Sequence, residues 1–330
     1  MWNILGHHRA VSLLQQAVRS GTPNHAYLFL GPPRTGKSTI ARTFAQALNC
    51  TGQEPPCGHC PDCQKILHGS HPDVDIVVAG DTANPKAKLI KIERFRDVIR
   101  QSTLLPAEGR YKVVIIDADA VLSVQASALL KTLEEPGGHI VFVLTALTED
   151  RIPHTIVSRC QVLHLAPMPR EALARALTER FALTLDRATR IAWLAGGRAG
   201  RAIDLIENPS ILETEEADID RLLAAWNSRS YDRLVLSASL STTAERANEA
   251  LEVWASWWRD AMSVAVGHET GVARLERLAD LRTFVARSNP AALAHHLHCI
   301  QRTADLLASN VNPRLAMEVL SLELSPTSPP

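Results

Sequence analysis

Residues 31–38 read Gly-Pro-Pro-Arg-Thr-Gly-Lys-Ser, which fits the phosphate-binding loop pattern G-x-x-x-x-G-K-[ST]. In such a loop, backbone N–H groups surround phosphate oxygens, Lys37 neutralises phosphate charge and the Ser38 hydroxyl can ligate Mg²⁺. The alternative is a Gly/Pro turn that binds nothing. The sequence favours a site for ATP or ADP with Mg²⁺, built from Gly31, Pro32, Pro33, Arg34, Thr35, Gly36, Lys37, Ser38 and Thr39.

An acidic residue follows a later apolar run, as a nucleotide site requires. Asp117 comes directly after Val113–Ile116 and can hold Mg²⁺ through water. Hydrolysing ATPases of this class usually carry a glutamate next, which activates the attacking water, but here the next residue is Ala118. Asp119 could stand in, although its side chain leaves the backbone in a different direction. We therefore expect nucleotide binding with weak or absent hydrolysis.

Two arginines are candidates for phosphate contacts. Arg159 lies between Ser158 and Cys160, just before the last expected strand, and a guanidinium there could stabilise a transferring γ-phosphate in cis or in a neighbouring subunit. Taken alone, the tripeptide fits a salt-bridged surface arginine equally well. Arg201 ends the segment 196–201, Gly-Gly-Arg-Ala-Gly-Arg, and could reach phosphate from a lid, or could only solvate a helix face.

Four of the six cysteines gather in one short segment. Their spacing, C-x6-C-x2-C-x2-C, suits tetrahedral Zn²⁺ and leaves no open position for a substrate, so we expect a structural metal. Free thiols, an iron–sulfur cluster and disulfides are the alternatives, the last disfavoured in a reducing compartment. The expected ligands are Cys50, Cys57, Cys60 and Cys63.

Up to residue 165 the chain alternates apolar runs typical of strands with helical periodicity, which predicts an α/β fold with a parallel sheet and flanking helices. Ligands of such sheets bind at the carboxyl ends of the strands. The expected strands are 26–30, 74–78, 112–116, 140–144 and 161–165, and the expected helices are about 6–20, 37–49, 89–101 and 123–134.

The rest of the chain is helical in pattern. We expect a nucleotide-binding domain over 1–165, a small helical lid over 166–208, an all-α collar domain for oligomerisation over 209–325 and a frayed tail over 326–330. In the collar, Leu251, Trp254 and Trp258 recur at three- and four-residue spacing. Such a stripe serves a core or a subunit interface, and the core is favoured.

Composition limits the classes of function. Lysine plus arginine equals aspartate plus glutamate, 35 each, so the chain as a whole has no basic field for independent DNA binding. This argues against a zinc-dependent DNA-binding module, whose cysteines would in any case already be used by the metal. The chain has no long apolar run and no signal-peptide pattern, which predicts a cytoplasmic protein.

Five longer strings carry a family resemblance: His25–Phe29, Cys63–Asp73, Ala128–Pro136, Thr155–Cys160 and Asn312–Glu318. With the phosphate-binding loop and the cysteine cluster, they make the chain similar to the bacterial clamp-loader branch of the AAA+ ATPases, and within it to the delta-prime type of subunit of DNA polymerase III. The resemblance implies an AAA+ P-loop domain with a zinc module, a helical lid and a helical collar.

The resemblance also implies a function. In this family, delta, delta-prime and gamma or tau subunits bind ATP, open the sliding beta clamp and place it on primed DNA. A delta-prime subunit acts as a stator whose Ser-Arg-Cys arginine, here Arg159, reaches a neighbour's ATP.

Some positions depart from the family pattern. The first cysteine gap is short, and Ala146 and Leu147 stand where motor subunits tend to have a polar phosphate sensor. The alternative, a gamma/tau-like motor ATPase, is disfavoured by Ala118.

Overall fold

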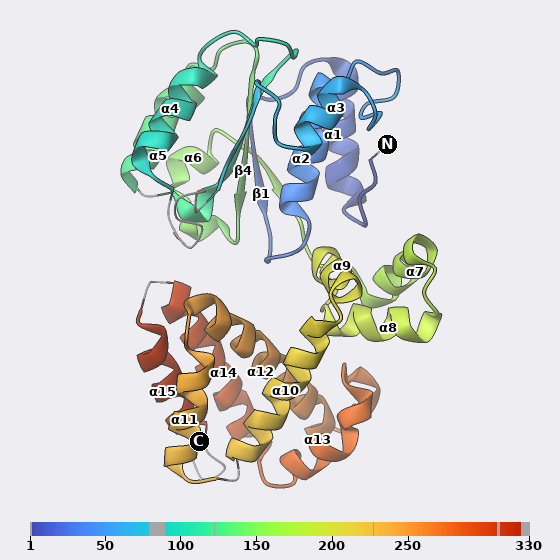
Figure 1. Cartoon of the computed structure of the whole chain (residues 1–330), viewed down its shortest axis with the longest axis vertical. Helices are drawn as coiled ribbons and strands as arrows, with labels where there is room; N and C mark the ends of the chain where they lie inside the picture. Colours follow the sequence, from blue (N-terminus) through green and yellow to red (C-terminus); the bar gives the residue numbers. More distant parts are fainter. Residues whose placement is uncertain (1, 79–89, 122, 227, 309–310, 325–330) are drawn as a thin grey trace. The chain divides into compact units, whose positions relative to one another are not determined.

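The structure, a computed structural model, describes residues 2–78, 90–121, 123–226, 228–308 and 311–324 (Figure 1). The chain folds into two compact units. The N-terminal unit contains residues 1–182 and 196–201, and the C-terminal unit contains residues 183–195 and 202–330. The finer division into three domains at 166 and 209 stays a prediction, and the expected frayed tail lies outside the described residues.

The N-terminal unit is built on a five-stranded parallel sheet with the order β2-β3-β4-β1-β5. Every residue of β1 and β4 is buried, as apolar strands covered on both faces require. This confirms the predicted fold class. The strands are β1 (Ala26–Leu30), β2 (Val74–Val77), β3 (Lys112–Asp117), β4 (Ile140–Ala146) and β5 (Gln161–His164).

Helices cover both faces of this sheet (Figure 1). On one face α1 (His8–Ser20) and α2 (Lys37–Asn49) pack through Leu14 and Phe44, with α3 (Pro61–Leu67) beside α2. On the other face Phe95, Leu129 and Ile156 of the remaining helices join the core. Those helices are α4 (Ile92–Ser102), α5 (Ser123–Glu134) and α6 (His154–Val157); two short 3-10 turns, η1 (Ala118–Ala120) and η2 (Glu149–Arg151), and α7 (Arg170–Phe181) complete the secondary structure.

The predicted element boundaries are close to those observed. Strand β1 and helices α2 and α5 begin and end at the predicted residues. Strands β3 and β4 run further than expected, because the ladder that pairs them continues to Asp117 and Thr145. Helix α1 begins at His8 instead of residue 6, since Gly6 and His7 adopt positive φ values of 73° and 54°.

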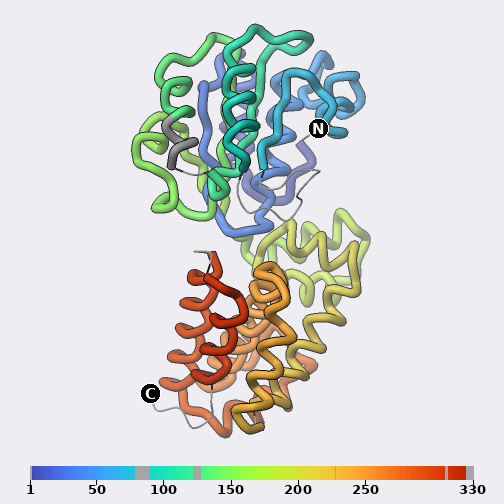
Figure 2. The backbone as a smooth tube through the Cα atoms, turned by 60° about the vertical axis from the view of Figure 1, so that its left-hand side comes forward, coloured from blue at the N-terminus to red at the C-terminus, as the bar shows by residue number. Residues whose placement is uncertain are grey.

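All the secondary structure described in the C-terminal unit is helical (Figure 2). Its core contains Trp254, Trp257 and Trp258 at no more than 1% exposure, and the Trp226 and Phe284 rings lie 4.7 Å apart. The tryptophan stripe is therefore core. The helices are α8 (Leu185–Leu194), α9 (Ala199–Glu207), which starts in the N-terminal unit, α10 (Ser210–Trp226), α11 (Ser230–Leu240), α12 (Ala244–Ala265), α13 (Leu278–Val285), α14 (Pro290–Ala308) and α15 (Pro313–Glu323), with the 3-10 turns η3 (Glu269–Gly271) and η4 (Leu275–Arg277).

None of the described helices is both long and apolar enough to span a lipid bilayer.

Candidate nucleotide site and zinc module

The phosphate-binding loop joins the carboxyl end of β1 to the first turn of α2. Arg34 and Gly36 have positive φ values of 60° and 103°, which turn the loop so that α2 starts directly at Lys37. Gly31 passes so close to the residue after β5 that a Cβ atom there would lie 2.3 Å from the Leu165 carbonyl oxygen. The loop therefore needs glycine at position 31 for space and at 36 for conformation.

Lys37 folds back onto this loop. Its ammonium group donates hydrogen bonds to the carbonyl oxygens of Gly31 and of Pro32, the latter at 2.9 Å. Burial lowers the pKa of Lys37, and the carboxylates of Asp119 and Asp117 oppose that shift. An anionic phosphate would be a stronger partner for this half-buried cation than two neutral carbonyls.

Two carboxylates lie near Lys37 at the end of β3 and in η1. Burial raises the pKa of Asp117, the charge of Asp119 adds to the shift, and Lys37 partly offsets it. Asp119 Oδ2 accepts a hydrogen bond of 2.8 Å from the Leu147 N–H, just past β4. Asp119 is thus bound to the adjacent strand end through Oδ2, while its Oδ1 has no hydrogen-bond partner among the described residues.

Two other segments frame the loop from within the same unit. The Arg201 N–H donates to the Arg34 carbonyl oxygen at 3.3 Å, and a Cβ on Gly200 would lie 2.6 Å from that oxygen. The start of α9 therefore touches the phosphate-binding loop through its backbone. On another side, His7 Nε2 donates to the Thr35 carbonyl oxygen at 2.9 Å, and burial lowers the pKa of His7.

Arg159 lies at the opposite edge of the sheet. It precedes β5, whose first residue, Gln161, pairs with Tyr27 near the start of β1. The phosphate-binding loop follows the end of β1, so a five-residue strand separates the two positions, about 15 Å at roughly 3.3 Å per residue. The Arg159 side chain is 34% exposed, and its guanidinium donates to the Thr155 carbonyl oxygen at 2.8 Å and to Glu134 Oε1 at 2.7 Å.

The four cysteines of the cluster converge. Their sulfur atoms all lie within 4.8 Å of one another, close enough for one tetrahedral ion to bind all four. Backbone N–H groups point at three of the sulfurs: those of Gly52 and Cys57 at Cys50, that of Cys60 at Cys57 and that of Cys63 at Cys60, at 3.3 to 3.4 Å. Such donors stabilise thiolates, so the donor set fits a closed zinc module.

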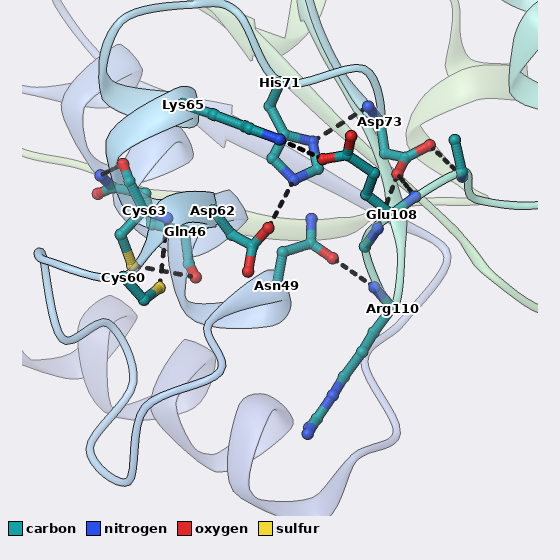
Figure 3. A network of polar contacts seen from close by, with 12 residues as sticks. Gln46, Asn49, Cys60, Asp62, Cys63, Lys65, His71, Asp73, Glu108 and Arg110 are labelled. Carbon is teal, nitrogen blue, oxygen red and sulfur yellow. Dashed lines mark hydrogen bonds and ion pairs between the residues drawn. The ribbon is translucent and has the colours of Figure 1, made fainter.

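Backbone-directed side chains connect this module to the sheet (Figure 3). The Asp73 carboxylate accepts 2.8 Å hydrogen bonds from the N–H groups of residues 107–109, and Asn49 Oδ1 accepts 2.9 Å bonds from those of residues 110 and 111. The three N–H donors outweigh the effect of burial and lower the pKa of Asp73. The loop before β3 is therefore fixed by two side chains, one that precedes the cysteine cluster in the sequence and one that follows it.

His71 is a structural residue of this connection (Figure 3). Its Nδ1 accepts a hydrogen bond of 3.1 Å from the Asp73 N–H, so the neutral ring carries its proton on Nε2. That Nε2 faces Asp62 Oδ1 at 3.4 Å. The ligand atoms of Asp62, His71 and Glu108 also lie within 4.8 Å of one another, in a group separate from the four cysteines.

The comparisons with known proteins identify the family. The family model described as "DNA polymerase III, delta subunit" matches residues 6–169. The delta' subunit of DNA polymerase III from Bacillus subtilis is 26% identical over 325 residues, covering 96% of this chain and 95% of that protein. Both matches support a member of the clamp-loader subunit family of bacterial DNA polymerase III. This confirms the resemblance drawn from the sequence strings.

The tau subunits of DNA polymerase III match only part of this chain. The tau subunit of Escherichia coli is 37% identical over 179 residues, which are 53% of this chain and 27% of tau. The chain thus spans about a quarter of the length of these longer relatives. A solved gamma-subunit-related protein from Thermotoga maritima aligns at 16% identity over 95% of this chain and 98% of that chain, with a TM-score of 0.49.

In this clamp-loader subunit the predicted site residues form three groups. The phosphate-binding loop, Asp117 and the backbone of Arg201 meet at the carboxyl edge of the sheet, Arg159 lies at the amino edge and the cysteines form the module. Sequence reasoning missed His7, which carried no local signal. It also missed Glu134, although two acids in succession before Pro136 are unusual at a helix end.

Proposed function

We propose that this chain is the delta-prime subunit of the DNA polymerase III clamp loader. In this role it is a stator-like subunit that binds ATP or ADP with Mg²⁺, helps to load the sliding beta clamp on primed DNA and supplies Arg159 to a neighbour's ATP. One observation carries the proposal: Arg159 and the phosphate-binding loop lie at opposite edges of one sheet. An arginine so far from its own loop can serve phosphate only in another chain.

The chain's own nucleotide pocket supports binding more than turnover. Lys37 would neutralise phosphate charge, the exposed Ser38 hydroxyl and Asp117 would hold Mg²⁺, and Arg201 would approach from the start of α9. No acid stands next to Asp117, and Asp119 is hydrogen bonded to Leu147. The acid that usually activates the attacking water, directly after the aspartate, is therefore missing, and we expect intrinsic hydrolysis to be weak or absent.

The C-terminal unit offers a surface for partner subunits. Leu315, Val319 and Leu322 of α15 recur at helical spacing and are 48 to 59% exposed. Helix α11, which packs against α15, exposes Tyr231 and Val235. An exposed apolar stripe on two adjacent helices supports a collar that contacts the delta and gamma/tau subunits. Contact with clamp and primed DNA would come through the complex, in the cytoplasm where this replication family works.

We propose further that the cysteine cluster binds one structural Zn²⁺, which would hold residues 50–63 in place. Purified protein should contain one zinc per chain by mass spectrometry, and Cys60→Ser should lose it. Cys160→Ser, outside the cluster, is the matched control and should keep its zinc. Chelation should lower the unfolding temperature by at least about 5 °C. Full zinc in Cys60→Ser would contradict a four-cysteine ligand set.

Reconstitution tests the whole function. The chain is combined with delta, gamma or tau, and the clamp, and ATP hydrolysis is measured with and without primed DNA. We expect the chain alone to bind nucleotide without measurable turnover, and the complex to need it for DNA-stimulated hydrolysis. Steady-state hydrolysis by the purified chain would instead favour a gamma/tau-like motor subunit.

A further inference from the structure

The end of α5 carries charge of the wrong sign for its position. Glu134 is the last residue of the helix and Glu135 follows it, before Pro136. The carboxyl end of a helix holds the negative pole of its dipole, which disfavours carboxylates there. A cation close to Glu134 would compensate for this local cost, and the structure supplies one from a distant part of the sequence.

That cation is Arg159, which is fixed from two sides. Its Nη2 donates to Glu134 Oε1 at 2.7 Å and its Nη1 donates to the Thr155 carbonyl oxygen at 2.8 Å. Glu134 belongs to α5 and Thr155 to α6, so two separate elements define where the guanidinium lies. A long arginine side chain has many rotamers, and these two contacts select among them before any phosphate arrives.

We infer that Glu134 is a positioning residue for Arg159. The inference rests on the proposed function, in which Arg159 meets the phosphate of a neighbour's ATP. A guanidinium has five N–H donors; Glu134 and Thr155 accept from two of them, and Nη1 also donates to the Ser158 hydroxyl at 3.5 Å. The others can bond phosphate oxygens while both contacts persist, so Glu134 presents the arginine at the surface in a fixed orientation.

The exposure of the pair argues against a role in holding the arginine back. Arg159 is 34% exposed and Glu134 51%, so water screens their attraction. A phosphate group carries more charge than one carboxylate and would readily replace it as the main partner. Glu134 therefore orients Arg159 and does little to restrain it.

The test compares two adjacent glutamates in the reconstituted complex. Glu134→Gln keeps the size of the side chain but removes its charge, and Glu135→Gln is the matched control one residue away. We expect Glu134→Gln to lower the kcat of DNA-stimulated ATP hydrolysis about threefold at unchanged KM, and Glu135→Gln to leave both unchanged. In an Arg159→Ala background Glu134→Gln should have no further effect.

Each outcome of this experiment is informative. If Arg159→Ala itself leaves hydrolysis unchanged, the proposed arginine role fails and the inference fails with it. If Arg159→Ala lowers the rate but Glu134→Gln behaves like Glu135→Gln, only the positioning role is overturned. A loss that persists in the Arg159→Ala background would mark Glu134 as merely structural, and a raised rate would show that it restrains the arginine.

Discussion

The two edges of the N-terminal sheet differ in how far their charged side chains are buried. At the carboxyl edge Lys37, Asp117 and Asp119 are partly buried. Burial lowers the pKa of Lys37 and raises those of the two aspartates, which favours the uncharged form of each. At the amino edge Arg159 and Glu134 form a pair that is partly open to water. The first arrangement suits a ligand that brings its own compensating charges. The second offers a permanent cation to another molecule.

Arg159→Ala should produce the largest effect on ATP hydrolysis by the complex and tests the amino edge. We expect DNA-stimulated ATP hydrolysis by the reconstituted complex to fall about tenfold or more, because an arginine supplied in trans stabilises the charge of the transferring phosphate. Nucleotide binding by the isolated chain should not change. Arg100→Ala, at another exposed arginine of the N-terminal unit, is the control. If the complex hydrolyses ATP normally without Arg159, the amino edge does not serve a neighbour's ATP.

Lys37→Ala tests the carboxyl edge and should show the complementary pattern. The affinity of the isolated chain for ATP or ADP should fall about tenfold to 100-fold, since a charge-assisted contact to phosphate is lost. Hydrolysis by the complex should change much less than in Arg159→Ala. Calorimetry measures the affinity, with Lys65→Ala in α3 as control. Equal losses of hydrolysis in both variants would show that the two edges are not functionally distinct.

Asp117→Asn should stabilise the isolated chain while weakening binding of Mg²⁺ and nucleotide. The pKa of Asp117 is raised in the folded state, so its contribution to stability is lost as pH rises from the ordinary carboxyl pKa of about 4 through the raised value. At pH 7.5 the variant should therefore unfold about 2 °C higher, with the gain disappearing near pH 4. Thermal scans at both pH values check this. A lower unfolding temperature of the variant at pH 7.5 would contradict the conclusion that the buried charge of Asp117 destabilises the folded chain.

Ala118→Glu should have the smallest effect. It supplies an acid next to Asp117, but the isolated chain still lacks a neighbour's arginine, so its own hydrolysis should rise less than about threefold. Single-turnover measurements with the purified chain would detect the change, and Ala118→Gln controls for size. A rise of tenfold or more would mean that only the missing acid separates this pocket from a working ATPase.

Much of this molecule could be predicted because its signals are local. The apolar run 26–30 predicted β1, the loop residues at 31–38 defined the start of α2, and the cysteine spacing anticipated the convergence of the four sulfurs. The pairing of Arg159 with Glu134 joins residues 25 positions apart, and that of Asp119 with Leu147 joins residues 28 apart. Such contacts depend on how elements pack, and no short pattern in the sequence reports them.

Strand β1 also separates the two edges electrically. Its five residues span about 15 Å, and two unit charges that far apart interact by only about 1 kcal/mol at an effective dielectric constant of about 20. The charge of a nucleotide in this chain's pocket should therefore be only faintly felt at the partly exposed Arg159. A neighbouring subunit would then contact the same arginine whether or not this chain has nucleotide bound. Any influence of the bound nucleotide on Arg159 would have to come from movement of the backbone.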